Sequence, residues 1–342
     1  MASIIREGLE FSAHQYAEQT TAKYTQHAFY FVRFLIAFQL LVIWADDAYI
    51  ARVVCWYAVF LSRSCSYRTI KTYFSGLAHF FAMHGLQNPT ILGGFYLQRL
   101  MQGIKRVKGD DVLPKRPITP AMLVQFHRLL RISAVDCSAA CLALYCAMLI
   151  AFFGFFRKGN VTSTASSWMK DTHALRRSSI VINYDTYTMW IKVTRTKTIQ
   201  FGERILWVPI QGLKGSPLDV IAIYIRMCDL IPASDDAHAF CDPSGSPLSH
   251  TVFVAEVKRL VSLLGMDPLS VAGHSFRRGG ASFAAYSGVS DAFIKLQGDW
   301  KSNAYLAYII IPLSQRTTVT ELMLSKISGG DLGEEIYGGA RV

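Results

Sequence analysis

The sequence is poor in charged residues and poorest in acidic ones. Of 342 residues only 17% are charged, and 24 aspartates and glutamates stand against 35 lysines and arginines, so the net charge is +11. A hydrophobic content of 51% excludes an intrinsically disordered chain, because disordered chains lack the apolar surface that folding buries. The positive excess favours a polyanionic partner, either a nucleic acid or an anionic membrane surface.

Disulfide and zinc patterns are also missing. The seven cysteines are an odd number and include no Cys-x-x-Cys pair. Cys137, Cys141 and Cys146 lie in an apolar stretch that offers no set of zinc ligands, so we expect buried thiols, which indicate a reducing compartment. Residues 1–15 include acidic side chains and no apolar segment, so we expect a protein that is not secreted.

One long uncharged run raises a membrane alternative. Residues 137–156 carry no charge over 20 positions, which is the length that a membrane-spanning helix needs. Their many small side chains equally suit a central helix that is packed on all sides inside a folded domain. Hydropathy by itself leaves both interpretations open.

The first third of the chain predicts four helices. Capping residues and stop signals place them at about 20–38, 46–63, 67–84 and 94–107. Residues 108–118 are rich in charge and proline and have no hydrophobic period, which indicates a linker. We therefore expect a helical N-terminal domain over residues 1–107 and a second domain over residues 119–342.

The second domain is expected to contain a small β-sheet among helices. Three segments rich in β-branched and aromatic residues, 179–184, 188–194 and 204–209, predict antiparallel strands. Helices are expected at about 119–132, 217–230, 249–264, 275–287 and 290–297. The predicted fold class is mainly α with a small antiparallel β-sheet. Both domains are basic, as expected if both bind one polyanion.

Basic residues in the second domain form the first candidate motifs. Arg157 directly follows the apolar run, and a guanidinium held there can contact phosphate with two nitrogens. Lys197 lies in the turn between the second and third predicted strands. His274 and Arg277 are three residues apart, so on a helix they share a face and can bind one phosphate together. Taken singly, each residue is explained better as a solvated surface charge.

An aromatic segment completes the pattern. GDWKSNAYLAYI, residues 298–309, offers the indole N–H of Trp300 and the hydroxyls of Tyr305 and Tyr308. In this order the motifs resemble the tyrosine recombinase (phage integrase) superfamily over residues 120–315. The segments FFGFFRKGN, GHSFRRGGAS and GDWKSNAYLAYI are especially similar to recombinases of eukaryotic mobile elements, such as Cryptons and DIRS-like retrotransposons.

The resemblance implies a catalytic domain, a mechanism and a residue set. Tyr308 is the implied nucleophile, which forms a 3′-phosphotyrosyl bond with DNA and frees a 5′-hydroxyl without metal, ATP or another cofactor. Lys197 is the implied general acid, and the other side chains stabilise the phosphate. The implied catalytic residues are Arg157, Lys197, His274, Arg277, Trp300 and Tyr308. The membrane interpretation is then removed, because this family buries the apolar helix in its catalytic core.

The N-terminal domain resembles the core-binding domain of the same family, and the two domains are expected to close as a clamp around double-stranded DNA. The candidate DNA contacts are Arg68, Lys71, Lys105, Arg106, Lys108, Lys115 and Arg116. For the pair on the third predicted helix, solvated surface charge is an equally good explanation. The family also implies a homo-tetramer on paired DNA sites, with a tail from about residue 316 exchanged between protomers. A nuclear location is expected in a eukaryote and the nucleoid otherwise, with no membrane and no small-molecule substrate.

Departures from the family pattern leave alternatives open. Asn160 stands where the family often has an acidic residue, and Trp300 stands where many members have histidine. The short spacing after Trp300 leaves Tyr305 as a second candidate nucleophile, and Lys192 and Lys301 compete for the role of general acid. A decayed DNA-binding relative and a type IB topoisomerase-like enzyme are therefore the alternatives to a recombinase.

Overall fold

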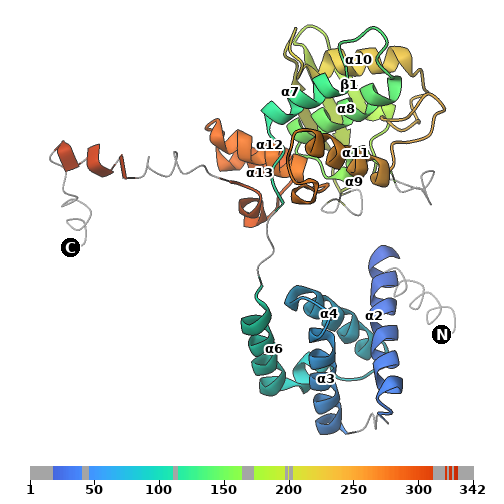
Figure 1. Ribbon diagram of the computed structural model, residues 1–342, viewed down its shortest axis with the longest axis vertical. Coiled ribbons are helices and arrows are strands. Elements are labelled where there is room, and N and C mark those ends of the chain that lie inside the picture. The colour runs from blue at the N-terminus through green and yellow to red at the C-terminus, as the bar shows by residue number, and fades with distance from the viewer. Residues whose placement is uncertain are drawn as a thin grey trace. The chain divides into compact units, whose positions relative to one another are not determined.

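A computed structural model of the chain consists of two compact units, Met1–Leu113 and Pro114–Val342 (Figure 1). The division between them falls within the predicted linker. The structure describes residues 18–40, 46–110, 115–163, 173–196, 199, 203–310, 320–321, 323–325 and 327–329. Most of the predicted exchanged tail therefore lies outside the described residues.

The first unit is helical in its described part. Its elements are α2 (Glu18–Ala37), α3 (Asp47–Ser62), α4 (Tyr67–Met83), α5 (Pro89–Leu92) and α6 (Gly94–Lys108). Ser66 begins α4 as a side-chain cap that accepts the backbone N–H of Thr69, as its hydroxyl and position predict. Aromatic side chains from three helices, including Phe31, Tyr57 and Phe81, form the core of this unit.

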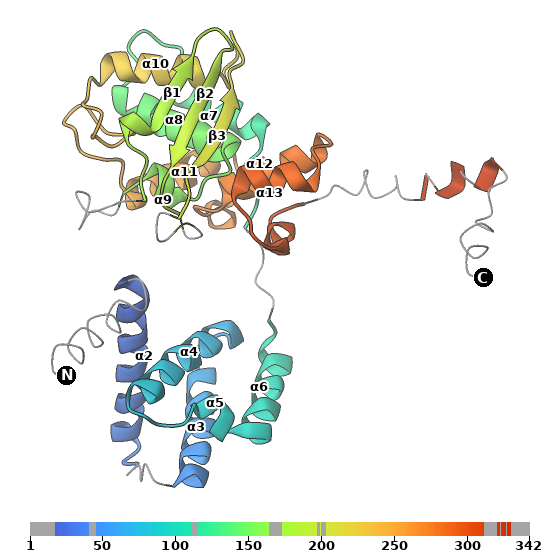
Figure 2. The same cartoon turned by 180° about the vertical axis from the view of Figure 1, so that it is seen from behind.

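The second unit places helices around a three-stranded sheet. Its helices are α7 (Pro120–Leu129), α8 (Ala139–Phe153), α9 (Lys158–Val161), α10 (Val220–Leu230), α11 (His250–Leu263), α12 (Ser275–Tyr286) and α13 (Asp291–Gly298), with short 3₁₀ turns η2 (Arg177–Ser179), η3 (Pro268–Ser270) and η4 (Asn303–Ala307). Strands β1 (Ile180–Asn183), β2 (Thr188–Val193) and β3 (Leu206–Gln211) lie side by side in antiparallel order (Figure 2). The predicted fold class is confirmed, although β3 begins two residues later than expected.

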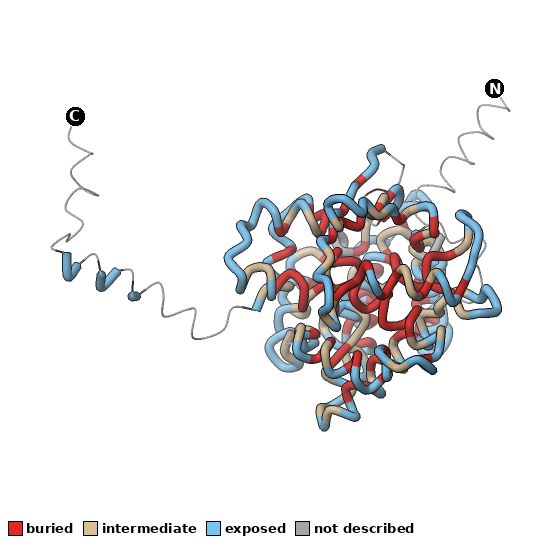
Figure 3. Tube along the Cα trace, turned by 90° about the horizontal axis from the view of Figure 1, so that it is seen from above, coloured by how far each residue is buried: buried red, intermediate tan, exposed pale blue. Residues whose placement is uncertain are grey.

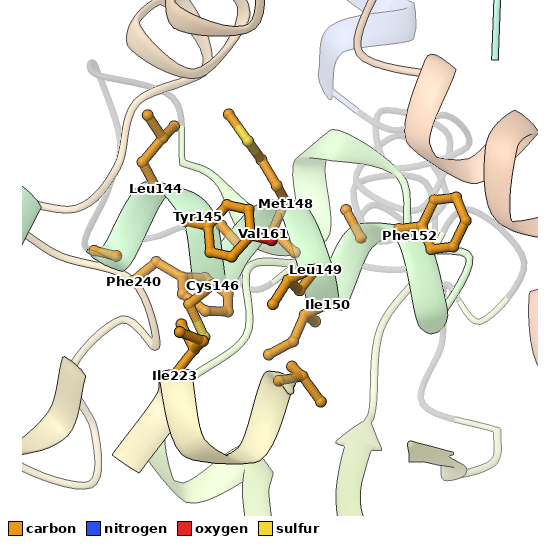
Figure 4. Packing of buried hydrophobic residues seen from close by; sticks show 14 of the residues in the cluster. Leu144, Tyr145, Cys146, Met148, Leu149, Ile150, Phe152, Val161, Ile223 and Phe240 are labelled. Carbon is orange, nitrogen blue, oxygen red and sulfur yellow. The ribbon is translucent and has the colours of Figure 1, made fainter. Parts of the chain in front are cut away.

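Helix α8 supplies the centre of this unit (Figure 4). Every side chain from Leu142 to Phe152 is buried, and the helix packs against α7, α10 and α12. Its 15 residues span about 22 Å, which is shorter than the hydrocarbon core of a bilayer at about 30 Å. Within the described ranges, no helix combines the length and the apolar character that crossing a membrane requires. The uncharged run is thus core, and the buried stretches drawn red in Figure 3 lie inside the exposed ones.

Helix α12 makes unusually close backbone contacts with its neighbours. A Cβ atom on Gly279 would lie 1.9 Å from the carbonyl oxygen of Ile118, and one on Gly280 would lie 2.1 Å from that of Phe152. Such atoms essentially never approach within 3.0 Å, so only glycine fits at either position. The two glycines therefore let the first turns of α12 rest directly on the segment before α7 and on the end of α8.

All seven cysteines are free thiols. Cys137 and Cys146 are buried as predicted, whereas Cys141 is only partly buried because it lies on the first turn of α8. Burial raises the pKa of the Cys146 thiol well above its usual value. Among the residues that the structure describes, no cluster of histidine, cysteine and acidic side chains is arranged to hold a metal ion.

Candidate active site

Three of the predicted site residues meet around one buried guanidinium. Arg277, in the first turn of α12, is 2% exposed and donates hydrogen bonds to the carbonyl oxygens of Phe155 and, at 2.6 Å, Gly298. Its Cζ atom lies 3.8 Å from the centroid of the Trp300 ring and 5.7 Å from that of the Tyr308 ring. The guanidinium is thus held by two backbone carbonyls and an indole face, beside a tyrosine.

The surroundings of Arg277 favour the binding of an anion. Burial, together with the nearby positive charge of Arg157, lowers the pKa of Arg277 to about 9, while the proximity of Tyr308 and Asp299 opposes that shift. At neutral pH the side chain is still charged, and it donates two hydrogen bonds to neutral backbone carbonyls. Its Nε atom is buried and has no hydrogen-bond partner in the described part of the chain. A buried cation with an unused donor can be stabilised by an anion that brings an acceptor oxygen.

Tyr308 follows η4 and is fixed to α12 through its own backbone. Its carbonyl oxygen accepts the hydroxyl of Ser282 at 2.9 Å, and the same Oγ atom accepts the backbone N–H of Ile310 at 3.0 Å. The half-buried Tyr308 ring lies 5.5 Å from the Trp300 ring centroid and 6.4 Å, in an edge-on arrangement, from that of His274. Ser282 therefore positions the tyrosine, although no sequence motif had singled it out.

Tyr305, the second candidate nucleophile, has a different environment. It is 3% exposed and belongs to a small core cluster with Phe155 and Trp300. A hydrogen bond to Asp291 raises the pKa of its phenol, and the Lys295 ammonium lies 5.1 Å from its ring centroid. Its hydroxyl is therefore committed to a carboxylate, so the geometry favours Tyr308.

His274 and Arg157 lie at the edges of the same site. His274 is the residue before α12 and is exposed, so it does not lie within the helix as the three-residue spacing predicted. Its ring nevertheless lies 6.4 Å from the Tyr308 ring, in an edge-on arrangement. Arg157 is half-buried at the start of α9. Of the competing lysines, Lys192 is half-buried in β2 and Lys301 is exposed beside Trp300.

Lys197 lies outside the described residues, but the chain on both sides of it is described. The backbone N–H of Thr196 donates to the carbonyl of Ile199 at 3.0 Å, and the N–H of Ile199 donates to Thr196 Oγ1 at 3.0 Å. Thr196 Oγ1 also donates to the carboxylate of Asp299 at 3.1 Å, and Arg204 forms an ion pair with that carboxylate. Asp299 was not predicted from the sequence. The feature that could have revealed it is an acidic residue at the C-terminal end of a helix, where the helix dipole disfavours negative charge.

Asn160 has a structural role that a carboxylate would not fill. The side chain is 6% exposed, and its Nδ2 donates to the carbonyl of His173 at 3.3 Å. The backbone carbonyl of Asn160 accepts the N–H of Leu175 at 2.8 Å. Because an ionised acid has no proton to donate to His173, the amide suits this local structure. Asn160 therefore has a packing role in this structure.

Comparison with known proteins identifies the architecture. No family model and no curated protein matches the chain, but 56 chains of solved structure do. XerH site-specific recombinase bound to its difH substrate superposes with a TM-score of 0.57 at 12% identity, covering 87% of this chain and 78% of that one. A lambda integrase (75–356) dimer bound to a core site superposes with a TM-score of 0.56 at 15% identity, covering 90% of this chain and 93% of that one. The chain has the tyrosine recombinase fold.

A third structure with the tyrosine recombinase fold is the Tn1549 transposon integrase in complex with circular intermediate DNA. It gives a TM-score of 0.50 at 14% identity and covers 79% of this chain and 84% of that one. At such identities the likeness establishes the tyrosine recombinase fold and leaves the chemistry to the residues. The closer resemblance to recombinases of Cryptons and DIRS-like elements stays a prediction.

Two of the predicted DNA contacts in the first unit of this recombinase fold, Arg68 and Lys105, meet at one carboxylate. Arg68 Nε lies 2.9 Å and Lys105 Nζ 3.1 Å from the carboxylate oxygens of Asp110, and these two hydrogen bonds lower the pKa of Asp110. The ammonium groups of Lys71 and Lys105 lie 5.9 and 5.5 Å from the ring centroid of Tyr67. Cations from α4 and α6 thus share one surface, which a single acid partly neutralises.

The remaining predicted DNA contacts lie on both sides of the division between the units. Arg106 and Lys108 are exposed on the last turn of α6. Lys115 and Arg116 belong to the second unit, where Lys115 Nζ and the Arg116 N–H donate to backbone carbonyls of residues 269–270 at 2.6 and 2.7 Å. The Lys115 ammonium therefore has an internal partner, whereas the Arg116 side chain is exposed.

Proposed function

We propose that this protein is a site-specific DNA recombinase that cleaves and rejoins DNA through Tyr308. The observation that carries the proposal is Arg277, a buried guanidinium fixed by two carbonyls against Trp300, with an unused donor and an accessible tyrosine beside it. This arrangement supports the proposal, because a tyrosine hydroxyl beside a fixed cation could attack a phosphate that the cation binds. The recombinase fold of the chain supports the same reaction class.

In the proposed cleavage step, the phenolic oxygen of Tyr308 attacks a DNA phosphorus atom. The new O–P bond forms as the bond from phosphorus to the 5′-oxygen breaks, the phenolic proton passes to water, and Lys197 protonates the departing oxygen. The strand then ends in a 3′-phosphotyrosine and a 5′-hydroxyl. Attack by a 5′-hydroxyl reverses these changes and rejoins DNA, so the step consumes no ATP.

The proposed role of the two arginines is to stabilise the charge that grows on the non-bridging oxygens. Arg277 is already fixed before DNA binds, so no free energy is needed to order it during the reaction. Arg157 adds a second positive charge near it, as its effect on the pKa of Arg277 indicates. His274 and Trp300 supply further hydrogen-bond donors at the rim. The mechanism proposed here uses no metal ion.

Double-stranded DNA is the proposed partner, held by both units. In the first unit, a groove between α4 and α6 is lined by Tyr67, Lys71, Gln98 and Gln102, which suit contacts with phosphates and base edges. XerH, lambda integrase and the Tn1549 integrase are all found with DNA in the structures compared. Assembly as a homo-tetramer on two paired sites is part of the proposal, because recombination joins two duplexes.

Capture of protein–DNA adducts tests the proposal. Cells expressing the wild type, Tyr308→Phe or Tyr305→Phe are lysed in denaturant, and DNA that remains attached to the protein is sequenced. We expect adducts at defined sites from the wild type and from Tyr305→Phe, and none from Tyr308→Phe. Adduct loss only in Tyr305→Phe would move the nucleophile. DNA binding without any adduct would indicate a decayed relative, and plasmid relaxation by a monomer would indicate a topoisomerase.

Neutralising Asp110 should strengthen DNA binding. In the free protein its carboxylate occupies Arg68 and Lys105, and it would repel a phosphate that approaches them. We expect Asp110→Asn to lower the Kd for duplex DNA by about two- to fivefold at low salt, which is typical of one surface charge. Fluorescence anisotropy at several salt concentrations measures this change, and the difference should shrink as salt rises.

Asp136→Asn is the matched control for this experiment, since it also removes one exposed, paired carboxylate. Asp136 and Arg131 form an ion pair at 3.3 Å and are both 71% exposed. We expect no change in affinity from this variant. Weaker binding by Asp110→Asn would show that the carboxylate orients the two cations for DNA, contrary to the expectation.

A further inference from the structure

We propose that Asp299 is a positioning residue that ties the connection carrying the general acid to the Arg277–Trp300 site. The proposal rests on the proposed function and names a residue that neither the sequence motifs nor the comparisons assign. It stands on the backbone conformation of Asp299, the burial of its carboxylate and the two segments that this carboxylate joins.

The backbone of Asp299 has a positive φ, a conformation that few residues other than glycine adopt. The residue ends α13 with φ 55° and ψ 47°, the left-handed conformation in which helices commonly place glycine. Its side chain is only 6% exposed. A buried carboxylate on a backbone that would accept glycine more readily indicates a specific task for the carboxylate.

Both oxygens of the carboxylate bind the connection between β2 and β3. Thr196, near the start of this connection, donates to Oδ2 at 3.1 Å, and Arg204, near its end, pairs with Oδ1. Lys197 directly follows Thr196 in the sequence. One side chain therefore fixes both ends of the connection that carries this lysine.

The same residue is joined directly to the phosphate site. Asp299 lies between Gly298, whose carbonyl accepts Arg277, and Trp300, whose ring lies against the same guanidinium. A Cβ on Gly298 would lie 1.7 Å from the Trp300 ring, so the chain here is tightly packed. Asp299, which holds the β2–β3 connection, is thus one residue away from two contacts of Arg277, those at Gly298 and Trp300.

This arrangement predicts a defect that is specific to one chemical step. Departure of the 5′-oxygen requires a proton, and a general acid acts only when it lies within hydrogen-bond reach of that oxygen. Loss of the Asp299 carboxylate should release the connection and slow protonation of the leaving group. The hydrogen bonds of Arg277 to backbone carbonyls do not involve the carboxylate and should persist.

Two variants separate this role from general damage. Asp299→Gly removes the carboxylate and gives a residue that suits the left-handed backbone, so the variant should fold. Asp299→Asn keeps an acceptor for Thr196 but loses the ion pair with Arg204, so its defect should be smaller. The control is Asp136→Asn, which alters an exposed carboxylate in the same unit that forms an ion pair with Arg131.

The kinetic test compares two leaving groups on one DNA sequence. The duplex carries a site recovered by adduct capture, with either oxygen or sulfur at the 5′-bridging position. A thiolate leaves without a proton, because a thiol has a pKa of only about 8.5. We expect Asp299→Gly to cleave the oxygen substrate about 100-fold more slowly than the wild type and the sulfur substrate within about threefold of it. Arg277→Lys should be slow on both substrates.

Hydrogen exchange on the free, full-length protein tests the tether without catalysis. Peptides covering residues 194–204 should exchange faster in Asp299→Gly than in the wild type, while peptides from α8 should not change. Unchanged exchange at 194–204 would overturn the tether, and equal defects on oxygen and sulfur substrates would overturn the link to the leaving group. If the wild type cleaves neither substrate, the proposed function fails, and exchange still decides whether Asp299 holds the connection.

Discussion

Replacing Arg277 by lysine should slow DNA cleavage by about 10³- to 10⁵-fold, the range seen when a cation that stabilises phosphoryl transfer is lost. A guanidinium can donate to Phe155, Gly298 and a phosphate at the same time, because its five N–H groups form a fixed fork. A lysine ammonium is a single point charge on a flexible chain. It keeps the charge but loses the orientation toward the phosphate.

The electrostatic state of Arg277 determines the pH range of this test. Because burial lowers its pKa to about 9, the folded protein keeps the side chain protonated below pH 9. The buried charge therefore lowers the free energy of unfolding by a constant amount at neutral pH. This loss of stability disappears only as the pH rises from about 9 toward the ordinary pKa of arginine. Cleavage measured between pH 6 and 8 should show no step due to this group.

Single-turnover cleavage and thermal unfolding together check the Arg277 prediction. We expect Arg277→Lys to unfold at a somewhat lower temperature than the wild type, because lysine keeps the buried charge but does not replace both hydrogen bonds to the carbonyls of Phe155 and Gly298, so cleavage is compared well below both unfolding temperatures. Arg259→Lys, which alters an exposed arginine paired with Glu256 on α11, should cleave normally. Cleavage by Arg277→Lys within about tenfold of the wild type would contradict the assigned role.

The second large effect should come from Gly279→Ala, which we expect to destabilise the second unit by about 3 kcal/mol or more. The new methyl group would lie 1.9 Å from a backbone oxygen of Ile118, and a backbone segment moves less readily than a flexible side chain. Relief of this clash requires α12 to move away from the segment before α7. That movement would also shift Arg277, two residues earlier on the same helix.

Gly103→Ala provides the opposite control in the first unit. Gly103 lies within α6, and a Cβ there would meet nothing within 4 Å. Alanine should therefore stabilise that helix by about 0.5–1 kcal/mol. Because the two units need not unfold together, hydrogen exchange read on peptides from each unit is the suitable measurement. Equal stability of Gly279→Ala and the wild type would show that α12 is not fixed at this contact.

The elements that local residues specify were predictable from the sequence. Ser66 and the Thr119-Pro120 pair gave the starts of α4 and α7, and the uncharged run gave the buried helix α8. The one-turn helices α5 and α9 were missed, because four residues offer too short a pattern for hydrophobic periodicity. The close backbone contacts of α12 were also not predicted. They depend on Gly279 and Gly280, which contact Ile118 and Phe152, segments far away in the sequence.

The sequence indicated that Arg277, Trp300 and Tyr308 belong together, and they do lie together, but their geometry was not predictable. Sequence spacing left Tyr305 and Tyr308 as competing nucleophiles, and the structure distinguishes them by the deeper burial of Tyr305 and its hydrogen bond to Asp291. The pairing of Arg68 with Asp110 spans 42 positions, so no local pattern reveals it. The contact of Asp299 was not predicted for a related reason, because its partner Thr196 is 103 positions away in the sequence.

The hydroxyl of Ser282 has a consequence for how Tyr308 is held. It contacts the chain on both sides of the Tyr308 side chain, through the carbonyl of Tyr308 and the N–H of Ile310. Because α12 supplies this hydroxyl and also carries Arg277, a shift of the helix would displace the tyrosine backbone and the guanidinium together. Loss of this one hydroxyl would remove both of these backbone contacts at once.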